Sequence, residues 1–166
     1  MINIPNTLTL LRIVLIPIFA LVFYLPVVWH YQVACLIFTI AALTDLLDGY
    51  LARRLGQTSR LGAFLDPVAD KLMVAVVLVF LVQDNPTVQL SLLAAVIIGR
   101  EIAVSALREW MAELGARGRV TVSLFGKVKT SVQMVALILL LYREPIYGLP
   151  VYDIGMVLLY IAAALT

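Results

Sequence analysis

The chain has few of the residues that a soluble domain or a cross-linked secreted protein needs. Only 13% of its 166 residues are charged, and it has a single cysteine, Cys35. A soluble globular domain is usually about a quarter charged and about half apolar, whereas this chain is 63% hydrophobic. One cysteine cannot build a disulfide framework, and so little charge and proline excludes a disordered chain. The composition therefore indicates a membrane protein.

Long apolar runs are what the chain has instead. These runs are continuous, which favours transmembrane helices over a barrel whose strands alternate with period two. No charged side chain occurs between Ile13 and Thr44, a stretch too long for one crossing of about 20 residues. The segment LPVVWHYQ divides it, because proline and aromatic side chains suit a membrane interface. We predict a single all-α, polytopic membrane domain (1–166) with six transmembrane helices, at about 7–27, 32–53, 62–83, 88–112, 124–142 and 151–166.

The basic residues fall almost entirely on one side of this arrangement. Arg143 alone lies on the other side, and the remaining cations are Arg12, Arg53, Arg54, Arg60, Lys71, Arg100, Arg108, Arg117, Arg119, Lys127 and Lys129. Loops rich in lysine and arginine stay in the cytoplasm, so we expect both termini to be cytoplasmic. The opening segment lacks the basic region and the small-residue cleavage site of a signal peptide.

Four aspartates gather near the cytoplasmic ends of the second and third predicted helices. Asp45 and Asp48 are three residues apart, and Asp66 and Asp70 are four apart, so each pair shares a helix face. Counted from the outer helix ends, the four carboxylates pair off at two matched depths, roughly 20 and 25 Å at about 1.5 Å per residue. Such a concentration of oxygen donors is typical of hard divalent cations. The alternative is that the aspartates cap helices or pair with Arg53, Arg54 and Lys71.

Two glycines lie beside these aspartates. Gly49 follows Asp48, and Gly62 precedes Asp66 by four residues. Glycine within a helix is unfavourable by about 1 kcal/mol relative to alanine. It permits either close helix approach or access of a ligand to the carboxylates, and both interpretations remain open.

The segment from Asp45 to Asp70 reads D-x2-D-G-x2-A-R-x8-G-x3-D-x3-D and resembles the signature of the CDP-alcohol phosphatidyltransferase family at every fixed position. The segments PNTLTLLR, REIAVSALREWMAELG and GKVKT extend the resemblance along the chain. It implies transfer of the phosphatidyl group from CDP-diacylglycerol to sn-glycerol 3-phosphate in the bacterial inner membrane, with the active site facing the cytoplasm. It further implies a homodimer and two Mg²⁺ or Mn²⁺ ions. The sequence departs from the family at its end, because relatives usually continue past the sixth helix with a short polar tail and this sequence stops at IAAALT.

The same resemblance assigns roles to individual residues. Asp45, Asp48 and Asp66 would hold one metal ion, and Asp45, Asp66 and Asp70 the other. Asp70 would also be the general base that takes the proton of the acceptor hydroxyl. The CDP-diacylglycerol pocket would be formed by Asn6, Thr9, Arg12, Gly49, Ala52, Arg53 and Gly62.

A phosphorylated acceptor requires cations of its own. The fourth and fifth predicted helices and the segment between them offer Arg108, Arg117, Arg119, Lys127, Lys129 and the hydroxyl of Ser131. These cations would equally satisfy the positive-inside rule or bind anionic lipid. An inositol phosphate acceptor would need the same cations, and only the resemblance favours glycerol phosphate.

Two other classes of function compete with the transferase. Acidic residues within membrane segments also occur in cation-coupled transporters, but transporters place them near the midplane on broken helices. A lipid-binding or scaffolding protein would need the cations without four aligned aspartates. We therefore favour the enzyme, with membrane lipid and no nucleic acid among its partners.

Overall fold

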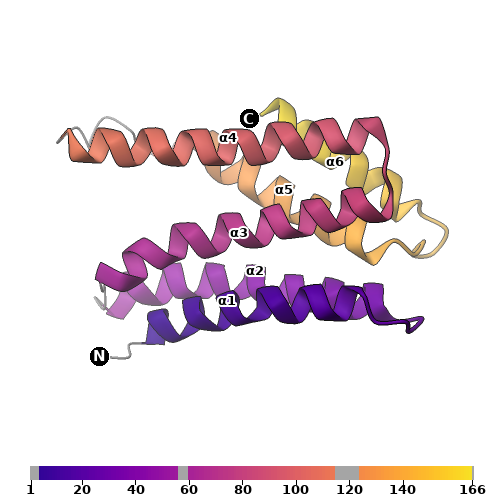
Figure 1. Cartoon of the computed structure of the whole chain (residues 1–166), viewed down its shortest axis with the longest axis horizontal. Coiled ribbons are helices and arrows are strands. Elements are labelled where there is room, and N and C mark those ends of the chain that lie inside the picture. Colours follow the sequence, from indigo (N-terminus) through magenta and orange to yellow (C-terminus); the bar gives the residue numbers. More distant parts are fainter. Residues whose placement is uncertain (1–3, 56–59, 115–123, 166) are drawn as a thin grey trace. The chain divides into compact units, whose positions relative to one another are not determined.

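The computed structural model describes residues 4–55, 60–114 and 124–165, with side chains for 7–47, 65–114 and 128–165. The described residues form six α-helices (Figure 1). In chain order they are α1 (Ile4–Phe23), α2 (His30–Leu55), α3 (Arg60–Asp84), α4 (Val88–Glu113), α5 (Leu124–Tyr142) and α6 (Val151–Ala164). The predicted all-helical class and the order of the helices are confirmed.

The helix ends follow the local chemistry of the sequence. Helix α1 ends at Phe23 and not near residue 27 as predicted, because Pro26 disfavours the helical conformation of the residue before it. Helix α3 ends at Asp84, one residue beyond the predicted end at 83 and two residues before Pro86. Helix α5 ends at Tyr142, and the next residue, Arg143, has a φ of 63° that turns the backbone out of the helix.

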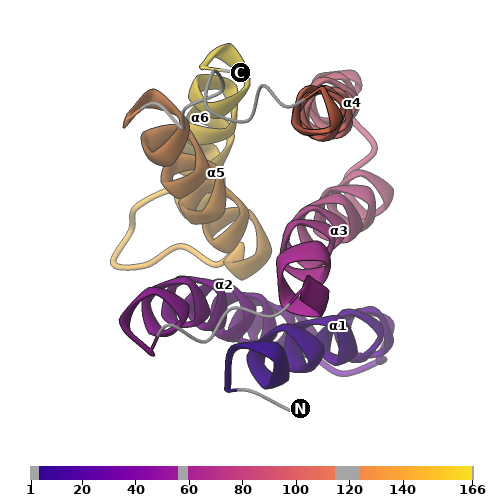
Figure 2. The same cartoon turned by 90° about the vertical axis from the view of Figure 1, so that its left-hand side faces the viewer.

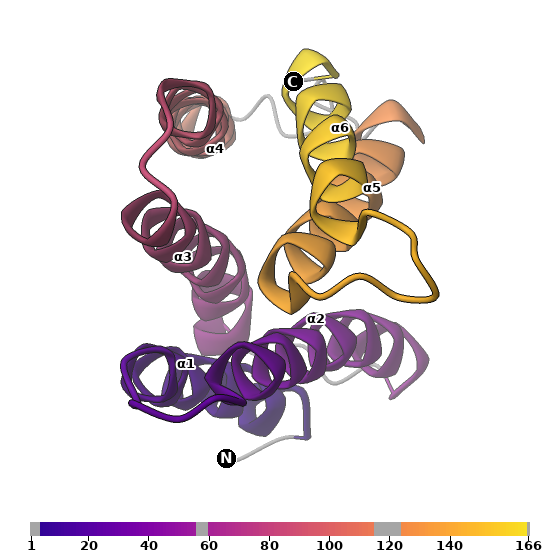
Figure 3. The ribbon, with the colours of Figure 1, turned by 90° about the vertical axis from the view of Figure 1, so that its right-hand side faces the viewer.

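The chain forms two compact units. Unit 1 comprises Met1–Phe80 and Leu141–Arg143. Within it α1 and α2 pack along each other, as Figures 2 and 3 show from opposite ends. The α2 face in this unit includes Ala34 and Ala41, each at most 1% exposed, and small residues allow helices to approach closely. Close packing therefore holds α1 and α2 together.

Aromatic side chains fill unit 1 at the far end of α1. The rings of Phe19 and Phe23 pack edge-on against Phe80 of α3, with centroids 5.8 and 5.0 Å apart. Arg143 donates a hydrogen bond of 2.8 Å to the hydroxyl of Tyr31 and lies 5.0 Å from the centroid of that ring. A segment distant in sequence is thereby joined to the start of α2.

Unit 2 comprises Leu81–Leu140 and Glu144–Thr166. Helix α6 lies beside α5 and also contacts α4 (Figures 2 and 3). A side chain at Gly155 of α6 would place its Cβ 3.0 Å from Leu140 Cγ and 3.2 Å from the Ala136 carbonyl oxygen of α5. The absence of a Cβ at this position is what lets the two helices meet.

Several helices are apolar enough for a membrane. Among the described residues, His30–Leu47 and Val88–Glu113 are long and apolar enough to cross one, and Thr7–Phe23, Val128–Tyr142 and Val151–Ala164 are shorter apolar stretches. Large apolar side chains are exposed along these helices, including Leu21 at 72% and Leu92 at 62%. Such exposure suits contact with lipid and indicates a membrane-associated protein.

The close contact at Gly155 predicts a selective loss of stability. Gly155→Val should destabilise the protein by about 1–3 kcal/mol, because the added carbons overlap Leu140 and the α5 backbone. The measurement is the midpoint of thermal unfolding in detergent. Gly99→Val is the matched control, since a Cβ at Gly99 meets nothing within 4 Å. Equal midpoints for the two variants would contradict the packing described here.

Candidate functional site

Helix α1 carries one buried stripe that begins polar and continues apolar. Thr9, Arg12, Ile16, Phe19 and Phe23 follow one another at spacings of three and four residues and are each at most 9% exposed. This spacing places them on one face of the helix. Thr9 is 0% and Arg12 is 1% exposed, so two polar side chains stand where apolar residues are expected. Both therefore need polar partners.

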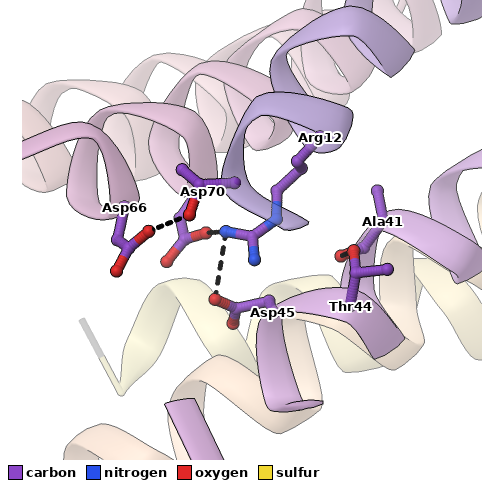
Figure 4. A network of polar contacts seen from close by, with 7 residues as sticks. Arg12, Ala41, Thr44, Asp45, Asp66 and Asp70 are labelled. Atoms are coloured by element: carbon purple, nitrogen blue, oxygen red, sulfur yellow. Dashed lines mark hydrogen bonds and ion pairs between the residues drawn. The ribbon is translucent and has the colours of Figure 1, made fainter. Parts of the chain in front are cut away.

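Arg12 finds its partners on two other helices of unit 1. Its Nη1 lies 3.1 Å from Asp45 Oδ1 on α2, and it donates a hydrogen bond to Asp70 Oδ1 on α3. Figure 4 shows the side chain reaching from α1 to a position between these two aspartates. The carboxylates are about one third exposed, at 29% and 34% for the side chains, whereas the Arg12 side chain is 2% exposed. One nitrogen thus joins three helices.

Thr9 makes the corresponding contact one helical turn away. Its hydroxyl donates to Asp66 Oδ1 on α3. Thr9 and Arg12 are three residues apart and Asp66 and Asp70 are four apart, so one turn of α1 faces one turn of α3. Thr44, next to Asp45, donates its hydroxyl to the Ala41 carbonyl of its own helix at 2.8 Å (Figure 4). Thr9 therefore orients Asp66, while Thr44 bonds to its own helix.

The charges of this site are unequal. Among the described side chains and the contacts given above, the three carboxylates of Asp45, Asp66 and Asp70 face the guanidinium of Arg12 and the neutral hydroxyl of Thr9. Like charges held close together and away from bulk water repel and pay for desolvation. The surplus of negative charge favours binding of a further cation, and a donor set made only of carboxylate oxygens fits a hard divalent ion.

The predicted convergence of four aspartates is seen for part of the set. Asp45 and Asp70 meet at one nitrogen, and Asp66 is joined to the same turn of α1 through Thr9. The side chain of Asp48 lies outside the described ones. Among described side chains, no three of the His, Cys, Asp and Glu residues gather closely enough to hold a metal ion directly. In this arrangement the guanidinium of Arg12 stands between two carboxylates predicted to share a metal.

The residues predicted to bind the nucleotide are only partly described. Thr9 and Arg12 contact the carboxylates of the site directly. The sequence had not predicted these contacts. A signal for them was present, because Arg12 is the first charged side chain of the chain and precedes Asp45 by 33 residues, and a charge in an apolar helix requires a partner. The side chains of the remaining members lie outside the described residues: Asn6, Gly49, Ala52, Arg53 and Gly62.

The residues predicted to bind the acceptor phosphate have different surroundings. Lys129 of α5 is buried, and its Nζ donates to Glu101 Oε1 of α4 at 2.7 Å within unit 2. Arg100 lies 3.7 Å from the same oxygen. Arg108 and Ser131 are exposed. Arg117, Arg119 and the side chain of Lys127 lie outside the described residues. Glu101, the partner of Lys129, was missing from the predicted site.

Comparison with known proteins identifies the family of the chain. The family model described as CDP-alcohol phosphatidyltransferase matches residues 2–166. Proteins from Shigella flexneri serotype 5b (strain 8401) and Escherichia coli (strain K12) are each 56% identical over 164 residues, which is 99% of this chain and 88% of the relative. Both are named CDP-diacylglycerol--glycerol-3-phosphate 3-phosphatidyltransferase.

The bond between Thr9 and Asp66 predicts a test of stability. Thr9→Val should lower the free energy of unfolding by about 1.5–3 kcal/mol, because a buried hydrogen bond to a charged group is lost. Thr44→Val is the control, because the Thr44 hydroxyl donates to the Ala41 carbonyl of its own helix rather than to a carboxylate. Thermal unfolding in detergent measures both. A greater loss for Thr44→Val would contradict the role given to Thr9.

Proposed function

The chain belongs to the CDP-alcohol phosphatidyltransferase family, and from this we propose that it transfers the phosphatidyl group of CDP-diacylglycerol to sn-glycerol 3-phosphate. The products are phosphatidylglycerophosphate and CMP. The observation that carries the proposal is 56% identity, over nearly the whole chain, to relatives named for this reaction. The family and the enzyme class predicted from the signature are confirmed. The chain is an enzyme of phospholipid biosynthesis.

The aspartates hold the cofactors of this reaction. Membership of the family implies divalent metal ions, and we propose two, Mg²⁺ or Mn²⁺, bound by Asp45, Asp48, Asp66 and Asp70. The oxygen-only donor set and its surplus negative charge support this assignment. When bound, such ions stabilise the negative charge that develops on the diphosphate and on the leaving CMP.

Asp70 acts on the acceptor. Its carboxylate takes the proton of the acceptor hydroxyl as that oxygen attacks the phosphorus attached to diacylglycerol. A new phosphorus–oxygen bond forms, the bond to the CMP oxygen breaks, and CMP leaves with the electron pair. The Asp70 side chain is about one third exposed, at 34%, and this exposure supports the role because the carboxylate stays accessible to an acceptor hydroxyl.

We propose a separate group of residues for each of the two substrates. Asn6, Thr9, Arg12, Gly49, Ala52, Arg53 and Gly62 form the CDP-diacylglycerol pocket. The acceptor phosphate is held by Arg108, Arg117, Arg119, Lys127, Lys129 and Ser131. A cluster of cations suits a phosphorylated alcohol, and an inositol phosphate would satisfy it equally. The names of the relatives favour glycerol 3-phosphate.

The membrane arrangement follows from the chemistry of the lipid substrate. We propose six membrane crossings with both termini in the cytoplasm, in the bacterial inner membrane, and a homodimer. The diphosphate of CDP-diacylglycerol lies at the headgroup level, while its acyl chains stay in the bilayer. A site for the diphosphate near the cytoplasmic helix ends, at about the level of the headgroups, lets the enzyme act without extracting the lipid.

The reaction and the acceptor can be tested together. Purified protein in detergent with CDP-diacylglycerol and Mg²⁺ or Mn²⁺ should release CMP when glycerol 3-phosphate is added, and a chelator should stop it. Asp70→Asn should lower kcat by about 10²–10⁴-fold, the usual contribution of a general base. Asp153→Asn, an exposed position on α6, is the control and should keep full activity.

The other outcomes of this assay have distinct meanings. Release with inositol phosphate alone would keep the mechanism and reject the acceptor. No release from folded protein with any acceptor would reject the transferase and favour cation transport.

The role of Lys129 needs a variant that separates acceptor binding from folding. Lys129→Met alone removes the 2.7 Å bond to Glu101, leaves only the longer 3.7 Å contact with Arg100 in its place among the contacts described above, and should lower stability. The double variant K129M/E101Q removes both charges and should unfold near the temperature of the unaltered protein. Its KM for glycerol 3-phosphate should rise about tenfold or more, with that for CDP-diacylglycerol unchanged, because a charge-assisted bond to phosphate is lost. An unchanged acceptor KM would make Lys129 a purely structural residue.

A further inference from the structure

Arg12 occupies a position that a metal ion would also require. Its Nη1 contacts Asp45 Oδ1 and Asp70 Oδ1 together, and these two carboxylates belong to the same proposed metal site. A guanidinium and a divalent cation each need the oxygens within a short contact distance, so both cannot bind the same pair of oxygens. The two cations are therefore alternatives at this point of the site.

The burial of Arg12 explains why it pairs with the two aspartates. An arginine that is 1% exposed in an apolar helix stripe is stable only while its charge is compensated. Two aspartates are likewise more stable with a counter-charge between them. The positive charge of Arg12 and the negative charges of Asp45 and Asp70 compensate each other, and this ion pair holds α1, α2 and α3 together. A cation that binds the same two oxygens must displace this arginine.

Asp66 is held separately from this contact. Its Oδ1 accepts from Thr9, a neutral donor that does not compete by charge. Loading of a cation between Asp45 and Asp70 can therefore leave the Thr9 contact in place, so that α1 stays anchored on α3 while the Arg12 side chain moves.

We propose that Arg12 is an exchangeable counter-ion: it neutralises Asp45 and Asp70 in the metal-free enzyme and gives them up when a divalent cation binds. This inference rests on the metal assignment of the proposed function. The released guanidinium is a planar donor suited to two phosphate oxygens, and the diphosphate of the nucleotide lipid is the anion that compensates it. Exchange of Arg12 thus couples loading of the metal to binding of the substrate.

The test measures binding of Mn²⁺ to substrate-free protein in detergent, from the loss of the free Mn²⁺ electron paramagnetic resonance signal. Arg12→Met keeps much of the apolar stem and removes the competing charge. It should bind Mn²⁺ about tenfold more tightly than the unaltered protein. The thermal midpoint of this variant should fall in chelator and recover in Mn²⁺, because the metal replaces the missing charge.

Lys71→Met is the matched control. It removes one positive charge from the residue next to Asp70, so it reports the general effect of charge on Mn²⁺ binding. The proposal requires the gain of Arg12→Met to exceed the gain of Lys71→Met. Equal gains would show that Arg12 affects Mn²⁺ binding only through the electrostatic field of its charge, and would overturn the exchange.

Two further outcomes are decisive. If Arg12→Met unfolds in chelator, it is purified in Mn²⁺, where the proposal expects a folded protein. Failure to fold with Mn²⁺ present would mean that Arg12 is needed beside the metal, which overturns the exchange. Absence of Mn²⁺ binding by every variant would reject the metal assignment itself. Binding by the unaltered protein without a gain in Arg12→Met would reject only this inference.

Discussion

The buried ion pair of Arg12 with Asp45 and Asp70 is the interaction on which the rest of unit 1 depends. An apolar helix can hold a guanidinium only if another element supplies negative charge. That requirement draws α2 and α3 to the same turn of α1. Further along α1 the same stripe is apolar, and Phe19 and Phe23 pack against Phe80. Charge therefore organises one end of the helix group and aromatic packing the other.

Much of this fold could be predicted because membrane helices leave strong signals in sequence. Continuous apolar runs predicted the number and order of the helices. The end of α1 was harder, because Tyr24 and Leu25 are apolar enough to continue a helix and only Pro26 opposes it. Apolar runs indicate which segments are helical, but they locate the helix ends less well.

The carboxylates of the candidate site could be predicted from the sequence, whereas the contacts that other residues make with them could not. Spacing identified two pairs, Asp45 with Asp48 and Asp66 with Asp70, because residues three or four apart share a helix face. No spacing rule relates Thr9 or Arg12 to an aspartate more than 30 residues away, and that contact exists only once α1 packs on α2 and α3. The pairing of Lys129 with Glu101 is of the same kind. Contacts between helices depend on rotation and depth, which a single sequence does not specify.

Arg143 also has a consequence for the order in which the protein is made. Leu141–Arg143 belongs to unit 1, and Arg143 bonds to Tyr31, 112 positions earlier in the chain. A chain synthesised from its N-terminus inserts α1, α2 and the first part of α3 long before this segment leaves the ribosome. Unit 1 therefore cannot be completed until all of α4 and α5 have been made. A chain released before Arg143 would therefore leave the aromatic end of unit 1 without its last contact.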